Sequence, residues 1–109
     1  MDVNLVVIAG RIAAPPELRE SASGTRLLRY LVTTKADAPR RRVDVVPVVT
    51  WDPPDELVAA PGVAGMGVWI SGSVQRRFWD ADGGRKSRLE IIAHEIEVRE
   101  RGSDSSTVS

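Results

Sequence analysis

The C-terminal half of the chain holds two long β-like segments joined by a tight-turn sequence. In residues 67–79 (GVWISGSVQRRFW), every second residue from Val68 to Val74 shares one side, and Trp69 lies on the other. Residues 80–84 (DADGG) supply the glycines that a turn with positive φ needs. Residues 85–98 return as a second strand, although their second half also fits a helical period. The pattern predicts a long antiparallel hairpin and a fold built mainly from strands.

Three further strands are predicted ahead of this hairpin, because β-branched and aliphatic residues dominate each segment. They are residues 4–12, 26–34 and 43–51. Pro47 interrupts the third one, and proline donates no hydrogen bond to a ladder, so we expect an edge position or a bulge there. The turn-rich residues 13–25 predict a loop. Residues 52–62 predict one short helix that begins after Asp52 and ends at Pro61-Gly62.

Five strands with a helix between the third and the fourth have the order of the OB-fold. We therefore predict an all-β, five-stranded OB-fold Greek-key barrel with one short helix between strands 3 and 4. A length of 109 residues suits one domain, which we place at residues 1–100. Residues 101–109 show no apolar periodicity and are predicted to form a disordered tail.

Composition excludes several classes of function. The chain has no cysteine and one histidine, His94, so we expect no disulfide, no metal centre and no cofactor, and we assign His94 no functional role. No Ser/His/Asp arrangement or phosphate-binding loop is present, and we predict that the chain is not an enzyme. Neither a membrane span nor a signal peptide is apparent, which favours a cytoplasmic, nucleoid-associated protein.

The zero net charge hides a segregation of charge along the chain. Residues 26–42 and 76–88 together hold eleven basic residues and three acidic ones, and the rest of the chain holds four basic and twelve acidic. Two solvated loops would explain this, but in an OB-fold strand 2, the loop after it and the last hairpin are expected to meet on one side. A basic face there suggests a polyanionic partner.

The same segments resemble the bacterial single-stranded DNA-binding protein (SSB) family. The resemblance rests on NLVVIAGRI with PELR, on VVTW, on VWISGSVQRRFWD and on LEIIA. These are residues 4–12, 16–19, 48–51, 68–80 and 89–93. Each motif is weak alone, but their order and spacing cover residues 3–98.

The resemblance implies an OB-fold that binds single-stranded DNA without strong sequence preference, in replication, repair or recombination. It also implies a homotetramer or homodimer. Trp51 and Trp79 match the family's base-stacking aromatics. The full set of predicted DNA-binding residues is Trp51, Trp79, Arg29, Tyr30, Lys35, Arg40, Arg41, Arg42, Arg76, Arg77, Phe78, Arg85, Lys86 and Arg88. Trp69, Val6 and Ile8 are predicted to lie in the subunit interface.

The chain also departs from the family pattern. Val45 and the segment 35–37 stand where the family often has tryptophans, and Pro47 replaces a position that is often basic. The long tail with an acidic tip, which recruits repair proteins in the family, is not expected here. These departures keep an alternative open: an OB-fold protein-interaction module of a replication or repair complex, similar to primosomal replication protein N, that binds DNA weakly.

Overall fold

The computed structural model describes residues 1–99 and has six strands and one helix. The elements are β1 (Val6–Ile12), β2 (Glu17–Glu20), β3 (Arg26–Ala36), β4 (Arg42–Trp51), α1 (Asp55–Ala59), β5 (Gly67–Ala81) and β6 (Gly84–Arg99). The predicted tail, residues 101–109, lies outside the described residues, as does residue 100 of the predicted domain. No helix within residues 1–99 is long and apolar enough to cross a membrane.

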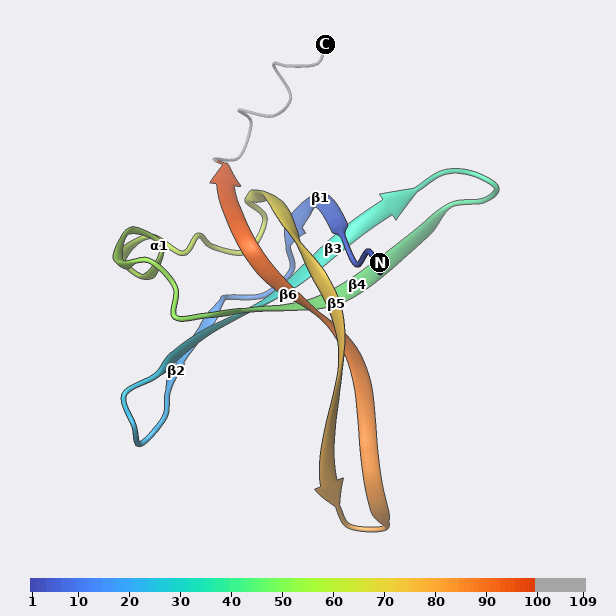
Figure 1. Ribbon diagram of the computed structural model, residues 1–109. Coiled ribbons are helices and arrows are strands. Elements are labelled where there is room, and N and C mark those ends of the chain that lie inside the picture. The colour runs from blue at the N-terminus through green and yellow to red at the C-terminus, as the bar shows by residue number, and fades with distance from the viewer. Residues whose placement is uncertain (100–109) are drawn as a thin grey trace.

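Five of the strands close into a barrel, which confirms the predicted OB-fold (Figure 1). The sheet order is β1-β5-β6-β4-β3-β2, and the pairing of Arg11 and Ile12 with Val32 and Thr33 joins β1 to β3. All pairings are antiparallel except that of β4 with β6, which pair in parallel at Val48 and Val49. The barrel is therefore mixed, with the single short helix between the third and fourth of its five strands.

The sixth strand, β2, corrects the prediction of a loop over residues 13–25. Glu17–Glu20 pairs antiparallel with Arg26–Arg29 of β3, and Gly24 adopts a φ of 89° in the turn between them. All four β2 residues are exposed, so no alternation of apolar and polar residues marks this strand in the sequence. It lengthens β3 into a hairpin at one side of the barrel (Figure 1).

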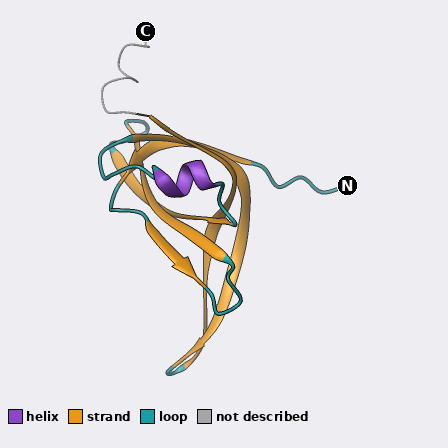
Figure 2. Cartoon of the chain, turned by 90° about the vertical axis from the view of Figure 1, so that its left-hand side faces the viewer, coloured by secondary structure: helices purple, strands orange, loops and turns teal. Residues whose placement is uncertain are grey.

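Alternate residues of the barrel strands fill a single core. Its buried members are Ile12, Leu28, Tyr30, Val32, Val48, Val68, Ile70, Ile91 and Ala93. Helix α1 spans five residues, fewer than the predicted segment 52–62, because Pro53 and Pro54 hold the chain extended before it begins. It lies across one opening of the barrel, where Leu57 packs against the core (Figure 2).

The last two strands extend well beyond the barrel. Their pairing runs from Gly67↔Arg99 to Ala81↔Gly84, with a bulge at Ser71/Gly72. A side chain at Gly72 would collide with the backbone carbonyl of Ile92, so the close crossing at the bulge requires glycine. Beyond it, Arg76–Ala81 and Gly84–Leu89 are exposed and project as a two-stranded arm (Figure 1). Strand β6 continues to Arg99, which settles the ambiguous period of this segment in favour of a strand.

Candidate nucleic-acid interface

Two of the three tryptophans are exposed. Trp51, the last residue of β4, is 56% exposed, and Trp79 on the arm is 41% exposed. Both therefore lie outside the hydrophobic interior, although an indole gains free energy from burial. Large exposed aromatic faces are what a base needs for stacking.

Trp51 borders a hollow on the outer surface of the barrel. Residues alternate between the two faces of a strand, and Leu28 and Tyr30 of β3 and Val48 of β4 face the core. Leu27 and Trp51 have the opposite parity, pair with each other across β3 and β4, and therefore face outward. The base of the arm forms the other wall. This Trp51 hollow measures about 340 Å³ and is lined by Leu27, Val49, Trp51, Gln75, Arg76, Arg77, Phe78, Glu90 and Ile92.

A second hollow brings together arginines that are 59 positions apart in the sequence. Arg29 of β3 and Arg88 of β6 line it, and its volume is about 190 Å³. The other lining residues are Ala14, Pro15, Glu17, Tyr30, Leu31 and Pro47. Arg88 also connects the two hollows, since its Nη2 lies 3.8 Å from Oε2 of Glu90. Strands β3, β5 and β6 thus contribute four arginines, Arg29, Arg76, Arg77 and Arg88 (the arginine cluster), to the two hollows beside Trp51 of β4.

The arm distributes its predicted residues over two faces. Arg77 pairs with Arg88 and Trp79 with Lys86, so these four side chains share one face. The other face carries Phe78, whose ring lies 4.7 Å from the guanidinium carbon of Arg85, and Arg76, which donates a hydrogen bond to Ser87. Each face therefore has one exposed aromatic residue with cationic side chains around it.

The basic loop after β3 lies apart from this cluster. Arg40 and Arg41 are at the tip of the β3–β4 hairpin, which projects from the barrel in a different direction from the arm (Figure 1). Arg42 forms an exposed ion pair with Asp44 at 3.1 Å. The two basic windows therefore meet only near the barrel, through Arg29, and their tips diverge.

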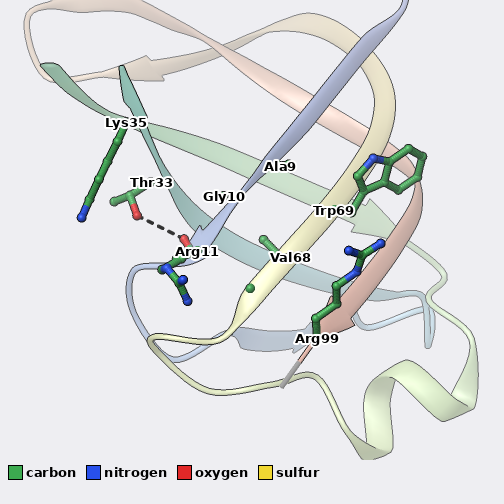
Figure 3. A pocket seen from close by; sticks show the side chains of 9 residues that line it. Ala9, Gly10, Arg11, Thr33, Lys35, Val68, Trp69 and Arg99 are labelled. Atoms are coloured by element: carbon green, nitrogen blue, oxygen red, sulfur yellow. Dashed lines mark hydrogen bonds between the residues drawn. The ribbon is translucent and has the colours of Figure 1, made fainter. Parts of the chain in front are cut away.

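Arg26 and Lys35, which also belong to the basic windows, lie outside the arginine cluster. Arg26 donates a hydrogen bond to Asp55 at 2.8 Å, and this bond raises the pKa of the Arg26 guanidinium while it ties β3 to α1. Lys35 lines a hollow of about 290 Å³ with Arg11, Trp69 and Arg99, on the side of the barrel formed by β1 and β5 (Figure 3). Lys35 and Trp69 lie at opposite ends of this hollow (Figure 3), and neither lines the Trp51 hollow.

Three predicted site residues face the core, and one of them needs correction. Tyr30 has no exposed surface, and its hydroxyl donates a hydrogen bond to the carbonyl of Pro61 at 2.7 Å, so it is unavailable to DNA. Val6 and Ile8 are half-buried and pack against the core cluster, and their role in a subunit interface stays a prediction. The exposed apolar residues of this segment are those of opposite parity: Val3, Leu5 and Val7.

Glu90 is a residue of this surface that was not predicted from the sequence. This carboxylate is only 6% exposed, yet it lines the Trp51 hollow, and its Oε2 is buried without a hydrogen-bond partner among residues 1–99. The alternation along β6 assigns Glu90 to the outward side, which normally means exposure. Only the fold reveals that the base of the arm and Trp51 enclose it.

Comparison with known proteins identifies the family. The family model described as "Single-strand binding protein family" matches residues 3–99. The chain is 31% identical to "Single-stranded DNA-binding protein 3" of Clostridium acetobutylicum, with 94% of this chain and 75% of that protein aligned. It is 30% identical to a "Single-stranded DNA-binding protein" of Clostridium tetani, with 98% and 77% aligned.

A solved structure shows the same fold. In "Plasmodium falciparum SSB complex with ssDNA", the protein superposes with a TM-score of 0.75 at 18% identity, over 92% of this chain and 96% of that one. The matched family consists of binding proteins without enzymatic activity, which confirms the prediction that this chain is not an enzyme. The barrel topology, the match over residues 3–99 and the relatives agree: the chain belongs to the single-strand binding protein family.

Proposed function

We propose that this chain binds single-stranded DNA without strong sequence preference, through the outer surface of β3, β4 and the arm. The observation that carries the proposal is the exposed ring of Trp51 at a hollow that it shares with Arg76 and Arg77. Arg29 and Arg88 extend the cationic surface next to it. Relatives named for single-stranded DNA binding, and a similar fold solved with such DNA, support the same conclusion.

Base stacking explains why the binding would not depend strongly on the DNA sequence. Every base has a π-face, so an indole accepts any of the four, and each stacked base contributes about 1–3 kcal/mol. Trp51 offers one platform, and Trp79, opposite Lys86 on the arm, offers a second. Phe78 with Arg85 lies on the other face of the arm and is a further contact for the strand.

The arginines hold the phosphates. Each neutralised phosphate releases condensed counterions, so the logarithm of the affinity falls by about 0.7 per contact for each unit of log salt concentration. We assign this role first to Arg29, Arg76, Arg77 and Arg88, which line the two hollows. Lys35, Arg40, Arg41, Arg42, Arg85 and Lys86 remain peripheral candidates, and Tyr30 is withdrawn.

A titration of oligo-dT of several lengths tests this function. Tryptophan fluorescence should be quenched, and solution mass measured in the same samples gives the footprint and the oligomeric state. Trp51→Ala and Trp79→Ala should each weaken binding about 5- to 150-fold for every lost stack. Trp69→Phe is the matched control, because Trp69 lies outside the Trp51 hollow. Absence of both quenching and a gel shift at about 50 mM salt, a concentration at which phosphate contacts are strong, would refute the function.

The biological setting proposed here follows from that binding: DNA replication, repair or recombination, in the cytoplasm, as a homotetramer or homodimer. Trp69 remains a candidate interface residue. It is half-buried, pairs with Ala9 of β1 and lines two hollows, and Trp51 lines neither of them.

A second function, that of a protein-interaction module with weak DNA binding, is favoured by one observation. The outer surface of β4 carries Val43 and Val45, which are 54% and 57% exposed, and Leu31 of β3 beside them is 39% exposed. An aliphatic strip gives bases less to stack on than tryptophans do, but it suits an apolar protein partner. A partner that stays bound after nuclease treatment and is lost in Val45→Asp, together with DNA affinity weaker than tens of micromolar, would favour this function.

A further inference from the structure

Glu90 is a buried acidic residue within a basic surface. It lines the Trp51 hollow with 6% of its surface exposed, and Arg88 Nη2 lies 3.8 Å from its Oε2, beyond hydrogen-bond distance. Oε2 has no hydrogen-bond partner among the described residues. A carboxylate in this position is costly, because burial removes water and nothing else donates to that oxygen.

Two buried polar atoms on this surface have no hydrogen-bond partner, and one is an acceptor whereas the other is a donor. Glu90 lacks a donor, and Nε of Arg29, also buried, lacks an acceptor within residues 1–99. Native proteins satisfy nearly all buried polar groups, so unsatisfied ones call for an explanation. A ligand that donates at Glu90 and accepts from the arginines nearby would satisfy both requirements.

The charges also orient a bound strand. Phosphates are repelled by the carboxylate and attracted by Arg77 and Arg88, which pair with each other nearer the tip of the arm than Glu90. A strand with its backbone on the arginines therefore turns its bases toward the hollow, and a base stacked on Trp51 presents an edge to Glu90. A carboxylate is an acceptor only, so it binds an edge that carries an amine.

On the basis of the proposed function, we propose that Glu90 reads the base held against Trp51 and favours bases with an exocyclic amine. Cytosine, adenine and guanine donate from such an amine. Thymine and uracil have a carbonyl oxygen in place of that amine, and their single N3–H donor lies between two carbonyl oxygens, which the carboxylate repels. Most positions of the bound DNA therefore accept any base, and one subsite in each protomer prefers a base with an amine.

The test compares oligo-dC with oligo-dU of the same length, on the order of eight nucleotides so that one protomer is engaged. These pyrimidines differ only at the edge that Glu90 would read. The full chain should bind dC about tenfold more tightly than dU, as expected for one added hydrogen bond to a charged group. Oligo-dT serves as a check on the methyl group and should behave like dU.

Glu90→Gln should abolish this preference, since an amide donates as well as accepts. Glu95→Gln is the matched control, because it removes the same charge from the same strand beside Ser71, outside the Trp51 hollow, and it should keep the tenfold ratio. Thermal melting of both variants shows that they are folded.

The remaining outcomes each have one meaning. Equal affinity of the unaltered chain for dC and dU overturns the role of Glu90 and leaves the proposed function standing. A dC preference that persists in Glu90→Gln also overturns it, as does a loss of affinity that is the same for both oligomers, which would make Glu90 only a support for Arg88. Failure to bind either oligomer, or oligo-dT, refutes the proposed function itself.

Discussion

Tyr30 stabilises the fold, although it lies on a strand that also carries arginines of the binding surface. Its ring is fully buried between the aliphatic core residues, and its hydroxyl ties β3 to Pro61, in the segment that follows α1. Burial raises the pKa of Tyr30 to about 12, because the phenolate would lose its hydration. The neighbouring positions Arg29 and Leu31 face outward, so the binding surface and the core alternate residue by residue along β3.

This burial makes stability sensitive to high pH. The folded protein holds the Tyr30 proton more tightly than the unfolded chain, in which the pKa is near 10. The contribution is therefore complete below pH 10 and is lost as the pH rises through about 12, and it amounts to about 2–3 kcal/mol of unfolding free energy. Denaturant unfolding between pH 8 and 12 (a range that brackets the tyrosine titration) measures it.

Tyr30→Phe provides the control for that measurement. It should be less stable by about 0.5–1.5 kcal/mol at neutral pH, since the bond to Pro61 is lost. Its stability should then decline less steeply above pH 10 than that of the unaltered chain. Parallel pH profiles for the two proteins would contradict the assignment.

The alternation of residues along a strand explains which predicted site residues face the core. In the apolar run from Leu5 to Ala9, no polar residue marks the outer side, so Val6 and Ile8 could not be separated from Leu5 and Val7 by sequence. Tyr30 lay between two arginine-containing stretches and was grouped with them. Trp51 and Trp79 were predicted correctly to be exposed, because their motifs place them at strand ends, where the barrel no longer covers them.

At the scale of elements, the strands rich in β-branched and aliphatic residues were predictable from the sequence. A strand that is defined only by its pairing with another strand was not. The β5–β6 hairpin was predicted from the alternation of residues 68–74 and from its glycine turn, and Gly83 and Gly84 have φ values of 90° and 120°. β2 was not, because its residues are all exposed and only pairing with β3 defines it. Pro47 lies just outside the two residues of β4 that pair with β6, which agrees with the expected edge position.

The arm places like charges directly opposite each other. Arg77 pairs with Arg88 across the two strands, an arrangement that weakens a sheet by a few tenths of a kcal/mol. We therefore expect Arg77→Gln to raise the stability by up to about 0.5 kcal/mol while it lowers the affinity for oligo-dT. The same variant should reduce the salt slope of binding by about 0.7. Melting curves and titrations at several salt concentrations measure the two effects.

Arg99→Gln is the control for the arm. Arg99 is the last residue of β6 and forms an ion pair with Glu97, outside the Trp51 hollow, and its substitution removes the same charge. This variant should leave the salt slope unchanged. If Arg77→Gln and Arg99→Gln reduce affinity and slope equally, Arg77 acts only through the overall charge of the molecule and makes no phosphate contact.

At the scale of the whole molecule, one exposed apolar strip lies apart from the arginine cluster. The cluster lies over β3, β4 and the arm, whereas the strip consists of Val3 and Leu5, ahead of β1, and Val7 of β1, with exposures of 80%, 70% and 57%. Both bonds of the Asn4 amide to the backbone of Val74 fix this segment against β5. Within the described residues, Val6–Gly10 pairs on one edge only, with β5, so the other edge is open.

An open strand edge beside an apolar strip favours pairing with a second copy of the chain, since both features are costly in water. We expect the protein to be at least a dimer in solution and Val7→Lys to convert it to the monomer, because a charge would then be buried in the interface. Val63→Lys, at a loop position that is 63% exposed, should leave the mass unchanged. Light scattering or sedimentation measures the mass, and short oligo-dT should still quench Val7→Lys because the Trp51 hollow is intact. A monomeric unaltered chain, or a Val7→Lys variant that keeps the mass of the oligomer, would place the subunit contact elsewhere on the barrel.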